Sequence, residues 1–325
     1  MKEEDIRPEK LFSEHLRLCK QDVQTYFHEV QRDRIKCPAC DSVGEFVFNK
    51  QGFEYECCPD CCTLFVSPRP KAEHFVKYYI ESSSSKFWAT TFYKETAEAR
   101  REKLWKPKAK MILEAMRKYE ATSHRVVDVG GGYGLFADEM QSLSGQPVLV
   151  VEPNPHFASV CREKSLQVID KFLEDIVKED IPSGAKAFVS FELFEHLHSP
   201  AVFLNHLERI MASGDLFLFT SLSGAGVDIQ VLWENSKSVS PPHHLNFLNP
   251  NSIKILLERI GLEILEVTTP GKLDIDILFN NQEMIKDRFW STFTASASES
   301  AKEKWQGLIA DSGWSSHMMV ICRKA

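Results

Sequence analysis

The sequence predicts a mixed α/β protein in which a parallel sheet follows a small cysteine-rich module. Short apolar strands alternate with helical segments from Arg125 onward, which is typical of βαβ units. One of these strands runs into a glycine-rich turn that begins at Gly130. Most of the nine cysteines lie between Cys37 and Cys62, which indicates a local cysteine motif and not a disulfide framework.

Composition and charge narrow the class of protein. The chain has 325 residues, of which 43% are hydrophobic and 26% charged, as in an ordinary globular protein of one or two domains. The net charge of −7 argues against a nucleic-acid partner, because phosphate contacts need clustered Lys and Arg. No apolar run reaches the roughly 18–20 residues that span a bilayer, and the charged first residues do not resemble a secretion signal. We therefore expect a cytoplasmic protein with reduced thiols and no membrane partner; the oligomeric state stays open.

Three regions precede the α/β domain. We expect a helical lead-in over residues 1–34 and a β-ribbon that carries the cysteines over residues 35–70. Residues 71–119 are expected to form a helical linker or lid, irregular over 71–94 and helical over 95–119. The basic side chains of that helix alternate with glutamates at helical spacing, which favours a solvated, salt-bridged face over an RNA groove.

The α/β domain is expected to cover residues 120–325. Its predicted strands are 125–129, 148–152, 166–170, 187–191, 215–221, 262–268 and 317–323, of which the third is the least well marked. Its predicted helices are 134–143, 156–164, 200–212 and 251–260. An insert of about 272–316 separates the last two strands, and we expect its three tryptophans to pack in a core or lid: Trp290, Trp305 and Trp314.

Two C-x₂-C motifs in the ribbon predict a zinc site. The expected ligands are Cys37, Cys40, Cys58 and Cys61. Their spacing lets four thiolates surround one tetrahedral Zn²⁺. Cys57 and Cys62 flank the second motif and could substitute, but they do not repeat the spacing of the first pair. Four protein ligands leave no open position for water, so we expect a structural ion that supplies folding energy to a segment too short to bury a large core.

The glycine-rich turn differs from a dinucleotide fingerprint. The third glycine of that fingerprint would fall on Leu135, and the observed pattern is instead Asp-x-Gly-x-Gly-x-Gly, starting at Asp128. The Asp128 carboxylate would repel a pyrophosphate but suits a ligand that carries an ammonium or a sulfonium. The next strand ends at Glu152, where a carboxylate can accept both hydroxyls of a ribose. The two features together favour an adenosine ligand with a cationic group.

These segments resemble the motifs of class I AdoMet-dependent methyltransferases. The residues that carry the resemblance are 128–135, 151–154 and 189–197, and it covers about 120–270. It implies a Rossmann-like, seven-stranded sheet with S-adenosyl-L-methionine at the carboxyl ends of the strands. It also implies that Gly130, Gly131 and Gly132 line the methionine portion, that Glu152 holds the ribose, and that Phe172 or Leu173 covers the adenine. The further cofactor-binding residues are expected to be Asp128, Pro153 and Glu192.

A narrower resemblance concerns the acceptor. The order of cysteine motifs, Tyr79, serine run, AdoMet domain and the segment 241–247 is similar to bacterial sugar methyltransferases, in particular C-methyltransferases of nucleotide-linked deoxysugars with an N-terminal zinc domain. This chain departs from that pattern because Asp41 and Cys62 stand where a glycine is usual after each second cysteine. The resemblance implies a sugar acceptor, nucleotide-linked or a glycan precursor.

Methyl transfer requires alignment of the acceptor and, where needed, removal of its proton. Histidine is the usual base near neutral pH. His244, His243 and His196 are the candidates, and each also suits a structural hydrogen-bonding role. Tyr79 could orient or deprotonate a hydroxyl, or simply pack. An RNA or protein methyltransferase that grips a polymer with the zinc ribbon is the alternative function, which the acidic charge and a ribbon with few basic residues disfavour.

Overall fold

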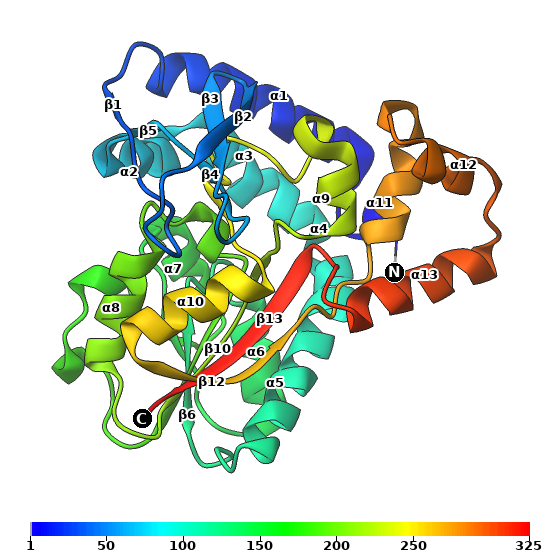
Figure 1. The fold of residues 1–325 in the computed structure, drawn as a ribbon. Helices are drawn as coiled ribbons and strands as arrows, with labels where there is room; N and C mark the ends of the chain where they lie inside the picture. Colours follow the sequence, from blue (N-terminus) through cyan, green and yellow to red (C-terminus); the bar gives the residue numbers. More distant parts are fainter. Residues whose placement is uncertain (1) are drawn as a thin grey trace.

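The computed structural model describes residues 2–325 and is built on a seven-stranded sheet (Figure 1). The strand order is β12-β13-β10-β9-β6-β7-β8. The strands are β6 (Arg125–Val129), β7 (Leu149–Val151), β8 (Gln167–Ile169), β9 (Lys186–Phe191), β10 (Leu216–Leu222), β12 (Leu262–Thr268) and β13 (His317–Lys324). Only β13 runs antiparallel to its neighbours, so the other strands present their carboxyl ends at one edge. The predicted mixed α/β fold, including the weakly marked third strand, is confirmed.

Helices cover both faces of this sheet because its strands are apolar on both sides. Alternate residues of β6 belong to opposite cores: Val127 packs with α8 (Pro200–Ile210) and α10 (Pro250–Ile260), and Val126 with α5 (Lys106–Lys118) and α6 (Leu135–Ser144). Helix α7 (Pro155–Glu163) joins the second face. The chain crosses from one face to the other between β6 and β9, and ligands of open α/β sheets bind at such a reversal. Short 3₁₀ turns complete this domain: η4 (Leu173–Asp175), η5 (Lys178–Asp180) and η6 (Phe194–His196).

The cysteine ribbon shares a sheet with a distant part of the chain. Its strands are β2 (Glu45–Lys50), β3 (Phe53–Cys57) and β4 (Leu64–Val66), and β11 (Asn246–Phe247) pairs with β4 from the other side. A second small sheet joins β1 (Arg32–Asp33) to β5 (Arg69–Pro70). The buried Arg69 guanidinium donates to the carbonyl oxygen of Leu245 and to Asn246 Oδ1, at 3.1 and 2.9 Å. The ribbon is therefore fastened to the α/β domain at the segment that carries His243 and His244.

The expectation that residues 71–94 are irregular is wrong. Helix α2 (Ala72–Glu81) is followed by a nearly continuous helical stretch: α3 (Ser83–Phe87), the π-helical turn η2 (Trp88–Phe92), α4 (Tyr93–Arg100), the π-helical turn η3 (Arg101–Trp105) and α5. The serine run caps a helix because the Ser82 side chain accepts from the Ser85 backbone N–H. Asp22 of α1 (Glu9–Tyr26) accepts from the backbone N–H groups of Ser83 and Ser84. This tertiary contact provides hydrogen-bond acceptors for the first N–H groups of the helix. Local sequence propensity cannot reveal such a contact.

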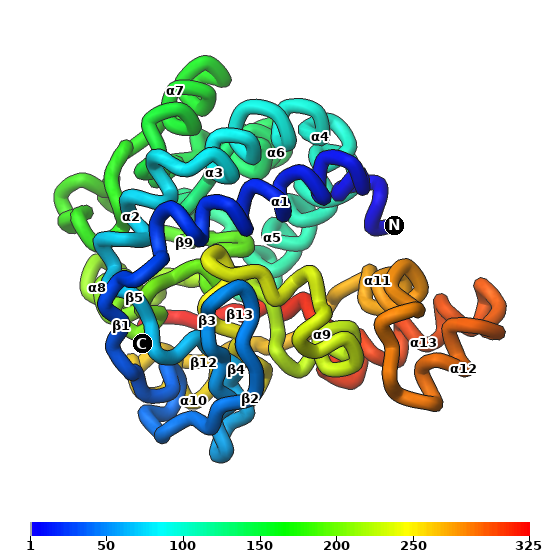
Figure 2. The backbone as a smooth tube through the Cα atoms, turned by 90° about the horizontal axis from the view of Figure 1, so that it is seen from above, coloured from blue at the N-terminus to red at the C-terminus, as the bar shows by residue number. Residues whose placement is uncertain are grey.

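The amino-terminal helix packs beside the ribbon, and the carboxyl-terminal helices form a separate group at the opposite end of the view (Figure 2). After η1 (Glu3–Asp5), α1 packs against α2, α3 and η2. The insert between β12 and β13 forms α11 (Asp274–Asn280), η8 (Gln282–Met284), α12 (Arg288–Ser296) and α13 (Glu299–Asp311), with a core shared with α9 (Val227–Leu232), which precedes η7 (Trp233–Asn235). Trp290 and Trp305 pack in this core, whereas Trp314 is 56% exposed. Across residues 2–325, no helix combines the length and apolarity needed to cross a membrane.

Candidate active site

The glycine-rich turn connects β6 to α6 at the strand ends. Gly130, Gly132 and Gly134 have φ of +74°, +53° and +68°, a left-handed conformation that only glycine adopts easily. A Cβ on Gly134 would lie 2.8 Å from Cys161 Sγ, so this glycine is required by packing. A Cβ on Gly132 would meet none of the described residues within 4 Å. The turn is therefore packed on its inner side and open at Gly132, as a loop that receives a ligand must be.

Two buried carboxyl groups stand beside this turn. Glu152 Oε2 accepts from the Gly132 N–H at 2.8 Å, and Glu152 Oε1 accepts from the Asn154 N–H at 2.9 Å. Asp128 is also buried, and its Oδ2 has no hydrogen-bond partner among residues 2–325. Burial, with a smaller effect of the Glu152 charge, raises the pKa of Asp128 to about 8, and burial also raises the pKa of Glu152. A cationic ligand beside them would lower the pKa of both carboxyl groups.

Aromatic side chains surround the entrance to the turn. Tyr93 of α4 stacks on Tyr133 with ring centroids 4.9 Å apart. Phe172 is 41% exposed and Leu173 only 4%, because Leu173 packs in the core with the sheet. Of these two, Phe172 is thus the one with surface to offer a ligand. Pro153 follows Glu152 directly and is half-buried.

Glu192, directly after β9, is the centre of a partly buried polar network. Its backbone has φ +52°, which is unusual for a residue with a side chain and is often found at functional sites. Lys108 Nζ and the Thr220 hydroxyl donate to Glu192 Oε1 at 2.9 and 2.7 Å, and His317 Nδ1 lies 3.4 Å from the same oxygen. The next residue, Leu193, touches the position where a Cβ of Gly130 would lie, at 3.2 Å. The Glu192 network therefore adjoins the glycine turn.

The structure brings His196, His243, His244 and Tyr79 together. The His196 ring lies 4.8 Å from that of His244 and 6.1 Å from that of His243, measured between centroids. The Tyr79 ring lies 6.0 Å from that of His243 and 6.5 Å from that of His196. A carboxylate oxygen of Glu195 and one ring nitrogen each of His196 and His244 lie within 4.8 Å of one another. The histidines follow β9 and precede β11, so two separate loops build one cluster.

Hydrogen bonds fix the state of these rings. The His244 Nδ1–H donates to the Ser238 carbonyl oxygen at 2.5 Å, so in the neutral ring the lone pair is on Nε2. The His243 Nε2 is bonded to the Tyr78 hydroxyl at 2.6 Å. Burial lowers the pKa of His196 to about 4 and that of His244 to about 3, and it holds the pKa of His243 well below its ordinary value. Near pH 7 all three rings are therefore neutral.

The four cysteines expected as zinc ligands converge in the ribbon. Their Sγ atoms lie within 4.8 Å of one another, with Cys37 to Cys61 at 3.5 Å and Cys40 to Cys58 at 3.4 Å. Cys57 and Cys62 are not members of this group. The four cysteines are Cys37, Cys40, Cys58 and Cys61. Asp41 and Cys62, which stand where the resembling family has glycines, both adopt the left-handed conformation, with φ of +64° and +56°. The knuckle geometry is thus kept without its usual glycines.

Several residues of the site were not predicted from the sequence. Lys108 looked like part of a solvated helix face but is buried against Glu192. His15 lies 5.3 Å from His243 between ring centroids, although α1 is far away in sequence. Tyr78 and not Tyr79 is the tyrosine that hydrogen-bonds a histidine side chain. The period of helix α2 could have indicated that Tyr78 faces inward with Phe75, but no local signal places His15 at the site.

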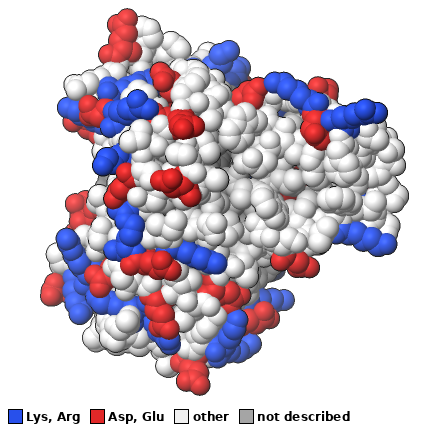
Figure 3. Space-filling view, in the orientation of Figure 1, with Lys and Arg blue, Asp and Glu red and all other residues white. Residues whose placement is uncertain are grey.

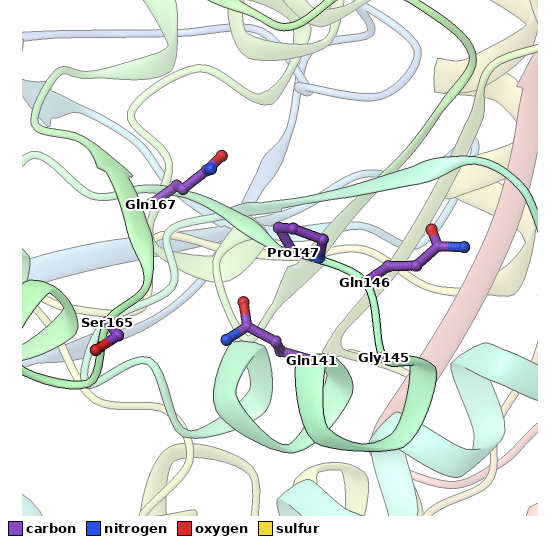
Figure 4. A pocket seen from close by; sticks show the side chains of 6 residues that line it. All are labelled: Gln141, Gly145, Gln146, Pro147, Ser165 and Gln167. Atoms are coloured by element: carbon purple, nitrogen blue, oxygen red, sulfur yellow. The ribbon is translucent and has the colours of Figure 1, made fainter.

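The hollow drawn in Figure 4 lies elsewhere. It is formed at the end of α6 and at the amino-terminal ends of β7 and β8, and its lining is Gln141, Gly145, Gln146, Pro147, Ser165 and Gln167. The glycine turn and the histidines lie instead at the carboxyl ends of the parallel strands. The hollow contains no candidate catalytic group. Basic and acidic side chains are interspersed on the face shown in Figure 3.

Comparison with known families agrees with this geometry. A family profile described as a methyltransferase domain matches residues 96–267. The chain belongs to this methyltransferase family. The match contains the glycine turn, Glu152, Glu192 and the histidine cluster at 196 and 243–244, and it identifies the protein as an AdoMet-dependent methyltransferase. The match begins at residue 96, so it includes Lys108 but not Tyr93. The helical linker therefore extends into the methyltransferase domain.

Individual relatives of this methyltransferase are distant. It is 22% identical over 163 residues to a ubiquinone biosynthesis O-methyltransferase of Xanthomonas euvesicatoria, covering 46% of this chain and 67% of the relative. A geranyl diphosphate C-methyltransferase from Streptomyces coelicolor is similar in structure, with TM-score 0.46, 12% identity, and coverage of 72% of this chain and 85% of that one. The magnesium protoporphyrin IX methyltransferase of Synechocystis has TM-score 0.46, 9% identity, and coverage of 74% and 97%. Likenesses at this level carry no information on the acceptor.

Proposed function

We propose that the methyltransferase acts on a small, hydroxyl-bearing acceptor, a sugar that is nucleotide-linked or a glycan precursor. The observation that carries this proposal is the cluster formed by three neutral histidines and Tyr79 near the glycine turn. Neutral imidazoles and a tyrosine hydroxyl can hydrogen-bond the hydroxyls of an acceptor, and an imidazole that removes a proton from one becomes the imidazolium cation. The O-methyltransferase named among the relatives is consistent with an oxygen-bearing small molecule.

The cofactor is proposed to occupy the open side of the glycine turn. Glu152 would hold the ribose hydroxyls, and Phe172 would cover the adenine. The backbone of the turn would receive the methionine portion, with Pro153 and Glu192 at its borders. The unpartnered Asp128 oxygen supports a cationic ligand nearby, because an ionised carboxyl group in that position lacks any other compensation. Bound AdoMet supplies the electrophilic methyl group, and the chain must align the acceptor with it.

We propose His244 as the base, because its geometry suits that role best. Its Nδ1 is anchored to the Ser238 carbonyl oxygen, so Nε2 is free to accept the acceptor's proton. His243 is less suited to act as the base, since its Nε2 is already engaged by Tyr78. Neighbouring Glu195 has a pKa raised to about 8 by burial and by the charge of Glu192, so its protonated carboxyl group can donate a hydrogen bond near pH 7.

The four-cysteine cluster is proposed to bind one structural Zn²⁺. Sulfur separations of 3.4–3.5 Å are close to the roughly 3.8 Å expected for thiolates around a tetrahedral zinc. The Asn249 side chain donates to the Cys61 carbonyl oxygen at 2.8 Å, and Arg259 donates to that of Ala39 at 2.5 Å. The ion would therefore stabilise a ribbon that supports the His243–His244 segment through β4 and β11.

The test is transfer of a labelled methyl group from AdoMet to a panel of sugar nucleotides, free sugars, RNA and protein. We expect incorporation into a sugar or sugar nucleotide, and a loss of at least a hundredfold in turnover in His244→Asn. His206→Asn, on α8 and outside the cluster, serves as the control. Incorporation into RNA or protein with none into the small molecules would replace this proposal by the polymer alternative. Full turnover of His244→Asn would place the base elsewhere.

A further inference from the structure

A second group of metal-ligating side chains lies outside the four-cysteine cluster. His15 and Cys19 are four residues apart on α1, so both side chains lie on one face of that helix. The His15 Nε2 lies 3.4 Å from Cys19 Sγ. One ring nitrogen of His243, from the loop before β11, lies within 4.8 Å of ligand atoms of both. Three side chains from two distant segments thus converge on one point.

The separations suit a single ion. Zinc binds sulfur at about 2.3 Å and nitrogen at about 2.0–2.1 Å, so a tetrahedral site separates an S ligand from an N ligand by roughly 3.6 Å. The His15 to Cys19 separation is already close to this value. It also matches the 3.4–3.5 Å between sulfur atoms of the four-cysteine cluster. The His243 ring nitrogen lies within 4.8 Å of both other ligand atoms, so the three side chains surround one point.

The protein does not otherwise satisfy these groups well. His15 and Cys19 are both buried, at 6% and 1% exposure. Within the described chain the His15 Nδ1 has no hydrogen-bond partner, and the side chain next to its Nε2 is the Cys19 thiol, a weak partner. Buried polar groups are rarely left in this state unless a water molecule or an ion is missing. The set of two imidazoles and one thiol is the kind that Zn²⁺ prefers over Mg²⁺ or Ca²⁺.

We propose that His15, Cys19 and His243 bind a second Zn²⁺ that fastens α1 to the acceptor side of the active site. Three protein ligands leave a fourth position, as in zinc sites that exchange a ligand. The Tyr78 hydroxyl, bonded to His243 at 2.6 Å and to the Ser84 hydroxyl at 2.9 Å, lies next to that position. The ion would hold His243 in place beside His244 and His196, which gives the lead-in helix a role in building the site.

Metal analysis of the full-length protein tests this inference directly. Purified protein is dialysed against metal-free buffer and its zinc is measured by plasma mass spectrometry per chain. We expect Cys19→Ala and His15→Asn each to lose one equivalent of zinc relative to the wild type. Cys322→Ala, which removes another buried thiol that belongs to neither cluster, is the control and should keep the wild-type content. Thermal melting verifies that each variant is folded.

Cobalt substitution gives a second readout that does not depend on activity. Co²⁺ bound to a thiolate and two imidazoles has a visible absorption that differs from that of a four-thiolate site, and Cys19→Ala should remove that component alone. A zinc content that is unchanged in both Cys19→Ala and His15→Asn overturns the proposal. So does an extra zinc that survives these changes but is lost in Glu195→Gln, because it would then lie in the neighbouring cluster of Glu195, His196 and His244. Either result leaves the proposed sugar acceptor unaffected, since transfer is assayed separately.

Discussion

Removing the Lys108 ammonium should destabilise the protein through Glu192. Lys108→Met keeps a long unbranched side chain but removes the ammonium group, which lies over the Trp105 and Phe191 rings and 2.9 Å from Glu192 Oε1. Breaking a buried ion pair by deleting one partner costs roughly 3–5 kcal/mol, because it leaves a buried charge uncompensated. The Lys108 side chain is 11% exposed and that of Glu192 34%, so solvent screens part of this cost. We expect a loss of about 2–3 kcal/mol in the free energy of unfolding.

Urea unfolding at pH 7 measures this loss, with Lys110→Met on the exposed face of the same helix as the control. Burial would raise the pKa of Glu192, but the positive groups facing it, His317 and Lys108, outweigh burial and hold that pKa below its ordinary value of 4.5. The ion pair therefore stabilises the protein above about pH 4.5, and its contribution disappears as the pH falls through the lowered pKa. The effect of Lys108→Met should shrink in acid accordingly. A cost equal to that of Lys110→Met at pH 7 would refute the buried pair.

Three further predictions concern the cofactor and the ribbon. Glu152→Ala should weaken AdoMet binding by at least tenfold in calorimetry, whereas Glu163→Ala on the exposed face of α7 should not; equal affinities would remove Glu152 from the ribose site. Because the pKa of Asp128 is raised to about 8, its proton should stabilise the folded apo-protein in acid, and this contribution should be lost as the pH rises from about 4 to 8. AdoMet binding at pH 7 should then release a proton, seen as a buffer-dependent binding enthalpy, and Asp128→Asn should abolish the release; the same release in that variant would contradict the assignment. Cys58→Ser should lose one equivalent of zinc and Cys57→Ser none, and the reverse would transfer the ligand to Cys57.

The sequence predicted the central sheet well because both faces of its strands are covered. A strand such as β10, which is buried along its whole length, begins with four consecutive apolar residues and is easily recognised. The glycine turn was predictable because positive φ at Gly130 and Gly132 restricts the choice of residue. The ends of β6 and β7 then place Asp128 and Glu152 at the turn by topology alone.

What the sequence did not predict depends on contacts between distant segments. The pairing of β11 with β4 involves residues roughly 180 positions apart, and no local sequence pattern indicates it. Residues 71–94 seemed irregular because serine favours turns, yet Asp22 supplies the partners that let a helix start at Ser83. Lys108 looked exposed because its neighbours on the helix are charged, but the helix turns it toward Glu192.

The most direct test of the account is a crystal structure of the complex with S-adenosylhomocysteine. We predict that both ribose hydroxyls bond the Glu152 carboxylate and that the homocysteine lies along the turn at Gly130–Gly132. The sulfur should face the cluster of His196, His243 and His244, where the acceptor would receive the methyl group. A ligand bound with its sulfur directed away from these histidines, or at a site that does not include Glu152, would contradict the account.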